Sequence, residues 1–210
     1  MRIRYLKQLS YLLWFVFLSQ IFAFNAFAVD SDFQNFSMAQ GLSQSTVSDI
    51  VEDKHGFIWF ATFNGLNRFD GYDFKKYFHE PNDPSSLPDN LVKNLILDDK
   101  QNLWVGTLYG LARYDENTDS FVIYNQSNSA LQNNDIYSLA LDSTGRLMVA
   151  DAKHLYLYEP ITNTFVIKQT LGVSLPPEIK FIFSEKDKTW IGSLGHGIFL
   201  LDNETNYLYN

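Results

Sequence analysis

The chain alternates between short stretches of bulky apolar residues and short polar turns, and this pattern occurs four times. Each copy has an alternating segment (46–51, 92–97, 136–141 and 179–184), then an apolar segment around one large side chain, then two more short segments. The large side chains are spaced 45, 44 and 42 residues apart and are Trp59, Trp104, Met148 and Trp190. A repeat of this length with four strand-like segments predicts an all-β β-propeller, with one four-stranded antiparallel blade per repeat.

The four large side chains and the turn glycines that follow them are the anchors of the repeat. The turn glycine supplies the positive φ that joins two strands, and the third copy has His154 in its place. We expect the tryptophans to lie largely buried on the second strand of successive blades, with Met148 filling the same niche. The predicted structural anchors are Trp59, Trp104, Met148, Trp190, Gly65, Gly110 and Gly197.

The repeats place blade 1 at 41–85, blade 2 at 86–129, blade 3 at 130–172 and blade 4 at 173–210. Residues 29–40 are predicted to hold an N-terminal closing strand, because 32–37 is similar to the fourth strand at 120–125 but follows no first three strands. Blade 4 already has a fourth strand near 206–209. We therefore expect about four blades in an incomplete, open propeller at the front of a longer protein; a complete four-bladed protein is the alternative.

The first 28 residues have the features of a secretory signal peptide. Arg2, Arg4 and Lys7 precede an apolar stretch at 11–24, and residues 26–28 form an Ala-Phe-Ala cleavage pattern. The alternative is an uncleaved membrane anchor, since 8–29 could just span a bilayer. Cleavage after Ala28 would leave 182 residues in the periplasm with a net charge changed from −8 to −11.

Composition excludes several classes of partner and site. The acidic chain argues against nucleic acid and anionic lipid, and the absence of cysteine excludes disulfide scaffolds and cysteine-ligated metal sites. None of the four histidines lies two or four residues from another, so no local metal site is expected. No catalytic, metal-binding or cofactor-binding residue is predicted, and no cofactor.

Recurring carboxylates invite an enzymatic interpretation. Asp53, Asp98 and Asp142 share one turn position, and a second position holds Asp70, Asp115, Glu159 and Asp202. Placement in successive blades spreads such groups instead of collecting them, and each can accept hydrogen bonds from the amides of its own turn. The turns also match poorly the Asp boxes of sialidase-type propellers.

The run 41–47, the turn-and-strand segment 53–62 and the segment 64–72 together resemble the two-component regulator propeller repeat. Segments 102–107, 110–115, 189–193 and 197–199 repeat the pattern, whereas the third copy lacks both the Trp and the Gly. The resemblance covers 33–210. It implies the periplasmic sensor region of a histidine kinase or diguanylate cyclase, anchored in the inner membrane, whose output domain is absent from this chain.

The resulting hypothesis is a periplasmic ligand-sensing module that is not itself an enzyme. Its expected partners are an unidentified small molecule or glycan, the remainder of the propeller and downstream signalling domains, with a homodimer of the full-length protein as a further possibility. The alternatives are a propeller glycosidase or lyase, which needs converging carboxylates, and a protein–protein scaffold, which needs an exposed apolar face.

Overall fold

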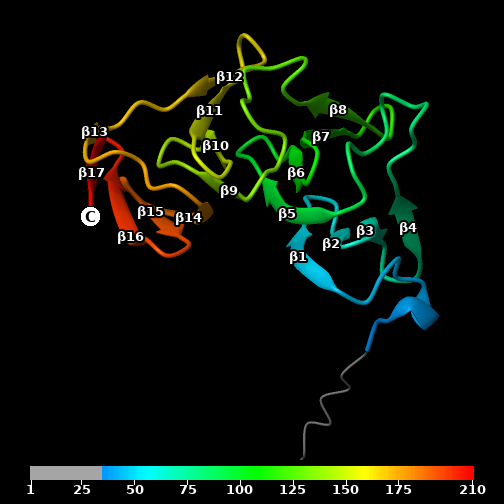
Figure 1. Ribbon diagram of the computed structural model, residues 1–210. Helices are drawn as coiled ribbons and strands as arrows, with labels where there is room; N and C mark the ends of the chain where they lie inside the picture. Colours follow the sequence, from blue (N-terminus) through cyan, green and yellow to red (C-terminus); the bar gives the residue numbers. More distant parts are fainter. Residues whose placement is uncertain (1–34) are drawn as a thin grey trace, which may run out of the picture. The chain divides into compact units, whose positions relative to one another are not determined.

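The computed structural model describes residues 35–210, which form four sheets in chain order, antiparallel except for one parallel pair in the fourth sheet (Figure 1). The strands of the first two sheets are β1 (Val47–Glu52), β2 (Ile58–Thr62), β3 (Gly65–Phe69) and β4 (Phe74–Tyr77), then β5 (Val92–Leu97), β6 (Leu103–Thr107), β7 (Leu111–Asp115) and β8 (Ser120–Tyr124). The other two sheets contain β9 (Ser138–Leu141), β10 (Leu147–Ala150), β11 (Leu155–Glu159) and β12 (Thr164–Ile167), then β13 (Leu171–Gly172), β14 (Ile179–Glu185), β15 (Lys188–Ser193), β16 (Gly197–Asp202) and β17 (Tyr207–Tyr209). The predicted all-β propeller with four-stranded blades is confirmed.

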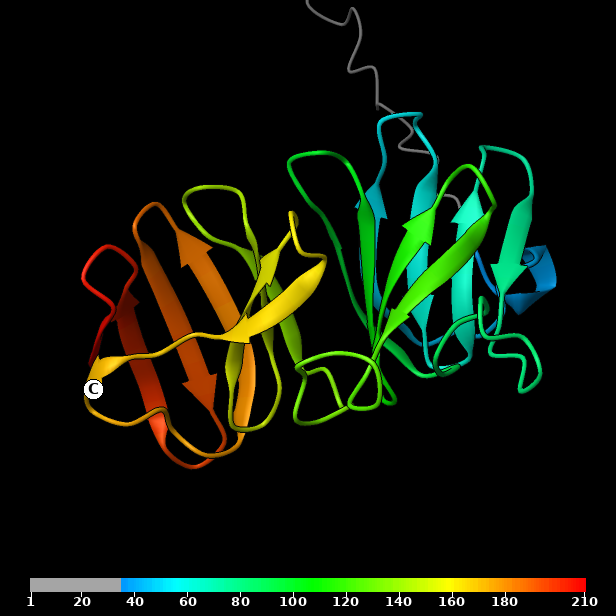
Figure 2. The same ribbon diagram turned by 90° about the horizontal axis from the view of Figure 1, so that it is seen from above.

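Successive blades pack through their first strands. β1 contacts β5, β5 contacts β9, and β9 contacts β14. Figure 2 shows the hairpins of each blade from the side. Three apolar clusters fill the spaces between blades, with Leu95 and Val105 in the first, Ile136 and Val149 in the second, and Ile182 in the third. In the described part, the contacts between strands of different blades join blade 1 to 2, 2 to 3 and 3 to 4 but not blade 4 to blade 1, so the propeller is open.

The fourth sheet differs from the others because it has five strands. The two residues of β13 pair in parallel with β17, with Leu171 opposite Tyr207 and Gly172 opposite Leu208. The sequence division placed 171–172 in blade 3, but their hydrogen bonds belong to blade 4. The segment therefore covers the outer edge of blade 4, which would otherwise leave unpaired backbone groups.

The predicted closing strand at 29–40 falls partly outside the described residues, and its described end is not a strand. Met38–Gln40 form a 3₁₀ helix. Ser37 is its N-cap, and Gly41, with φ 111°, is its C-cap. A capping box stabilises this turn: the Ser37 side chain accepts from the Ala39 amide, and the Gln40 side chain accepts from the Ser37 amide. These local bonds explain why the chain turns here instead of continuing as a strand.

The signal peptide predicted at 1–28 also lies outside the described residues. Within 35–210, no helix is long and apolar enough to cross a membrane.

Candidate functional site

The tryptophan anchors of blades 1 and 2 lie in equivalent seats between blades. Trp59 and Trp104 are buried, and each indole Nε1 donates to a turn aspartate, Asp53 at 2.7 Å and Asp98 at 3.0 Å. The carboxylates also accept the amides of their own turns, as expected for a structural role. The bond to the indole was missed from sequence, although the constant six-residue spacing from Asp to Trp is a signal that could have revealed it.

Two tyrosines complete each seat. The Trp59 ring lies 5.6 Å from Tyr77 of its own blade and 4.9 Å from Tyr114 of the next blade, measured between ring centroids. Trp104 lies 5.6 Å from Tyr124 and 4.7 Å from Tyr158 of the next blade. These aromatic contacts join consecutive blades, and edge-to-face contacts of this kind add to the free energy of burial.

A polar bridge accompanies each seat. The hydroxyls of Tyr77 and Tyr114 both donate to Asp119 at 2.7 Å, while those of Tyr124 and Tyr158 both donate to Asn163 at 2.6 Å. Burial alone would raise the pKa of Asp119, but hydrogen bonds from Lys75 and the two tyrosines outweigh it and lower the pKa to about 2. Asp119 is thus held as a carboxylate that ties blade 1 to blade 2.

The other two large anchors, Met148 and Trp190, differ in burial. Met148 is buried in blade 3, in agreement with the prediction, and packs with Ile182 and Ile191 of blade 4. Trp190 was predicted to be largely buried, and this is wrong: its exposed fraction is 41%. Its place on β15 is equivalent, but no later blade is present among the described residues to provide the covering tyrosine.

The glycine anchors take the predicted backbone conformation. φ is 98° at Gly65, 149° at Gly110 and 83° at Gly197. At Gly65 a side chain is also excluded by space, since a Cβ atom would lie 2.7 Å from the carbonyl oxygen of Tyr77. At Gly197 there is no neighbour within 4 Å of that position, so only the backbone angle demands glycine.

A cleft of about 340 Å³ opens between blade 1 and blade 2. Blade 1 contributes its β1–β2 turn and Arg68 of β3, and blade 2 contributes its β5–β6 and β7–β8 turns. Phe57, Trp59 and Tyr114 are its aromatic lining residues, and many of the other lining side chains are charged. Arg68 lies 4.6 Å from the Phe57 ring and donates to the Tyr114 hydroxyl at 3.1 Å. The lining residues that carry charge are Asp53, Lys54, His55, Arg68, Lys100, Arg113, Asp115 and Glu116.

The carboxylates of this cleft mostly have ion-pair or hydrogen-bond partners, whereas two of its cations have no carboxylate partner. Glu116 pairs with Lys54 at 3.0 Å and with His55 at 2.6 Å across the two blades. In the described part of the chain, no carboxylate lies within 4.0 Å of the charged nitrogens of Arg113 or Lys100. Arg113 instead lies 5.7 Å from the Trp104 ring and donates to the Tyr158 hydroxyl of blade 3 at 3.5 Å. The cleft therefore presents cationic groups in a protein of net charge −8, which favours an anionic ligand.

The carboxyl groups of residues 35–210 whose pKa is shifted are all shifted in the same direction. Each carboxyl group with a resolved shift, such as Asp70 and Asp142, has a pKa below its usual range, because hydrogen bonds to the charged form prevail over burial. A general acid needs a raised pKa instead. In the same residues, no group of three or more His, Asp or Glu side chains could hold a metal ion.

Two segments of the chain match a known family of propeller repeats. The profile described as two component regulator propeller matches residues 41–64 and 86–109. These two segments contain β1–β2 of blade 1 and β5–β6 of blade 2. The resemblance predicted from sequence is confirmed by these two matches. No curated protein sequence matches the chain.

Solved structures of similar fold include extracellular domains of two B. thetaiotaomicron proteins. The first, from the hybrid two component system BT3049, is 27% identical, with a TM-score of 0.74 over 84% of this chain and 26% of that one. The second, from the one component system BT4673, is 21% identical with a TM-score of 0.70, over 84% of this chain and 27% of that one. This chain thus spans about a quarter of either domain.

Virginiamycin B lyase from Staphylococcus aureus has the same fold at 15% identity, with a TM-score of 0.57 over 79% of this chain and 55% of that one. At this identity the similarity concerns the fold alone.

Proposed function

Because the chain carries repeats of the two-component regulator propeller family, we propose that it is the ligand-sensing propeller module of an exported bacterial signalling protein. The two matched repeats carry this proposal, together with the likeness to the extracellular domain of a hybrid two component system.

Export is the first element of the proposal. It is supported by the basic, apolar and small-residue order of residues 1–28. The full chain expressed in a Gram-negative host should appear in the periplasmic fraction with Val29 as its first residue, as measured by N-terminal sequencing or intact mass. An intact Met1 species in the inner membrane would show the uncleaved anchor instead.

Ligand binding is the second element, and the cleft between blades 1 and 2 is the proposed site. Its cationic side chains favour a small molecule or glycan that carries a carboxylate, with the half-buried Tyr114 ring available to an apolar or sugar face. The output would be a histidine kinase or a diguanylate cyclase in another part of the full-length protein.

A matched pair of ligands tests the site. We expect a uronic-acid trisaccharide to bind in calorimetry and the neutral trisaccharide of the same linkage to bind at least about tenfold more weakly, the difference that a charge-assisted bond supplies. Arg113→Gln should remove this preference, and Lys76→Gln, an exposed cation of β4, should keep it. Equal binding of both sugars, or of both variants, would exclude the cleft as the site.

The scaffold alternative has a specific observation in its favour, since blade 4 exposes several large apolar side chains.

A further inference from the structure

A second cleft, of about 250 Å³, lies between blades 2 and 3. Blade 2 contributes its β5–β6 turn and Arg113, and blade 3 contributes its β9–β10 turn and Tyr158. In the first cleft, between blades 1 and 2, the β1–β2 turn, Arg68 and Tyr114 hold the equivalent places. The second cleft is therefore the first one repeated by the next pair of blades.

The arginines show that the two clefts are equivalent and adjoin each other. Arg68 lies opposite Trp59 in the register of blade 1, as Arg113 lies opposite Trp104 in blade 2. Each arginine donates to a tyrosine hydroxyl of the next blade, at 3.1 Å for Arg68 and at 3.5 Å for Arg113. Arg113 and Lys100 line both clefts, so the clefts meet at these two side chains.

One position differs between the clefts and changes their charge. In the first cleft, Glu116 pairs with His55 at 2.6 Å and with Lys54 at 3.0 Å. In the second cleft Pro160 has the place of Glu116, two residues after the cleft tyrosine, and Lys100 has the place of His55, four residues before the tryptophan. The cation of the second cleft therefore lacks the acid that pairs with its counterpart in the first.

The other charged residues of the second cleft offset this only in part. Arg146 pairs with Asp142 at 2.9 Å, and Asp98 accepts the Trp104 indole N–H at 3.0 Å. Asp99, which is exposed, is the remaining carboxylate among the lining residues. Two cations without a carboxylate partner thus stand against one such acid, which leaves an excess of positive charge for an anionic ligand.

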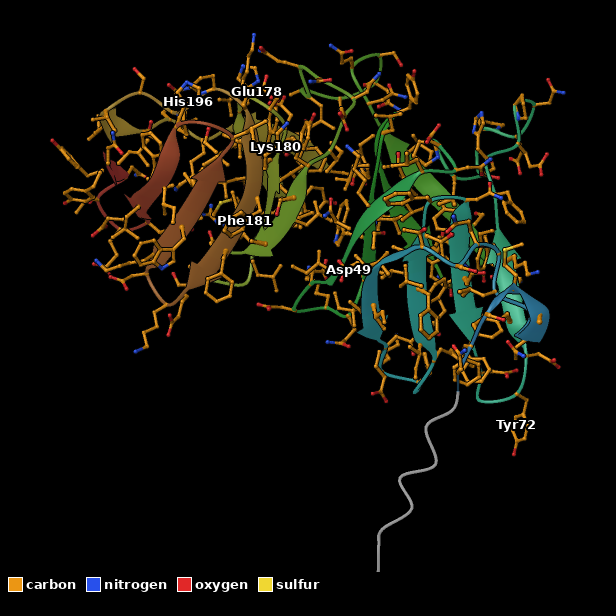
Figure 3. The ribbon with its side chains drawn as sticks, turned by 60° about the horizontal axis from the view of Figure 1, so that its bottom comes forward. Asp49, Tyr72, Glu178, Lys180, Phe181 and His196 are labelled. Atoms are coloured by element: carbon orange, nitrogen blue, oxygen red, sulfur yellow. The ribbon has the colours of Figure 1, made fainter. Side chains whose placement is uncertain are left out.

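A cation of blade 4 shows the contrast. Lys180 of β14 pairs with Glu178 at 3.0 Å (Figure 3). Within residues 35–210, Lys100 and Arg113 have no such carboxylate within 4.0 Å. The junction of the two clefts is therefore a place where cations are available to a ligand.

The size of the clefts favours one ligand that occupies both. Small-molecule sites in proteins have volumes of about 300–1,000 Å³. The first cleft, at about 340 Å³, lies at the lower end of this range, and the second, at about 250 Å³, lies below it. Together they offer room for a longer ligand than either cleft holds alone.

Resting on the proposed sensing function, we propose that the ligand is a linear oligouronate that extends from the first cleft into the second. Its successive carboxylates bind Arg68 in the first cleft, Arg113 at the junction and Lys100 in the second cleft. The guanidinium groups suit carboxylates because they can donate two parallel hydrogen bonds, and the Lys100 ammonium adds a point charge. A polymer with one charge per sugar thus matches a propeller that repeats its cations from blade to blade.

Chain length tests this proposal. Calorimetry on the full chain compares the uronic-acid trisaccharide with the hexasaccharide of the same linkage. The hexasaccharide should bind at least about tenfold more tightly, with one sugar per protein, because the second cleft is then filled without a second association step. Equal affinities would overturn the second cleft and leave the proposed site standing, whereas no binding of either sugar would overturn both.

Pro160→Glu tests whether the second cleft supplies the gain. The variant gives this cleft the acid that Glu116 supplies in the first, so it should lower the affinity for the hexasaccharide to that for the trisaccharide. The affinity for the trisaccharide should stay unchanged. The turn accepts glutamate, because blade 2 has Glu116 at the same place and the two turns share a positive φ, 52° at Asp119 and 51° at Asn163.

Ile161→Glu is the matched control. It adds the same charge at the next residue of the turn, where Ile161 is 96% exposed and does not line the cleft. This variant should keep the preference for the hexasaccharide. A preference that survives Pro160→Glu, or that both variants remove alike, would overturn the second cleft as the binding site.

Discussion

Replacing Trp104 with Ala should lower the free energy of unfolding by about 3–5 kcal/mol, the range for removing a large buried aromatic side chain. The indole is completely buried, contacts the rings of Tyr124 and Tyr158, and donates to Asp98. The substitution therefore leaves a cavity at the junction of blades 2 and 3 and removes the hydrogen bond that the indole donates to Asp98. Urea unfolding followed by circular dichroism measures the change.

Trp190→Ala is the matched control for this experiment. The residue has the same place on its strand, but it is 41% exposed, and no tyrosine of a following blade covers it within residues 35–210. We expect a loss of about 1 kcal/mol or less. Equal losses at the two positions would contradict the interblade seat as the reason for the stability that Trp104 confers.

Gly65→Ala should be the second most damaging change. The backbone there has φ 98°, and the added Cβ would lie 2.7 Å from the Tyr77 carbonyl oxygen and 2.9 Å from the Phe78 ring. The positive φ alone costs about 1–3 kcal/mol for a residue with a side chain, and the contact with rigid backbone adds to it. We therefore expect the free energy of unfolding to fall by at least about 1–3 kcal/mol.

Gly56→Ala separates the two causes. Gly56 has a similar φ of 81° in the β1–β2 turn, but nothing lies within 4 Å of its Cβ position. This variant should lose only the cost of the backbone conformation, so its stability should exceed that of Gly65→Ala. A Gly65→Ala protein as stable as Gly56→Ala would show that β3 and β4 adjust to admit the methyl group.

Most of the fold could be predicted because each blade repeats the same local pattern. The alternating segment predicted at 92–97 is β5, and the turn glycines have the expected positive φ. Trp190 could not be placed correctly by the same reasoning. Its burial depends on a neighbouring blade and not on its own strand, and a repeat pattern does not show whether that neighbour is present.

The site was harder to predict than the fold because it lies between repeats. The interblade bonds of Asp119 and Asn163 join residues about forty positions apart, and both residues occupy unremarkable turns in the sequence. The cations Arg113 and Lys100 could not be assigned to a cleft from sequence either, because the cleft is formed only when blade 1 packs against blade 2. The prediction of a strand at 29–40 rested on the similarity of 32–37 to a fourth strand and did not consider the capping box that Ser37 and Gln40 form in the structure.

Recovery of the bound sugar tests the sensing role most directly. The full chain is incubated with the uronic-acid trisaccharide at a concentration that saturates the cleft, and the sugar is then analysed by mass spectrometry. A sensing module should bind the trisaccharide and return it unchanged. Cleavage or elimination of the sugar, abolished by replacing a single Asp or Glu, would contradict this role and identify an enzyme.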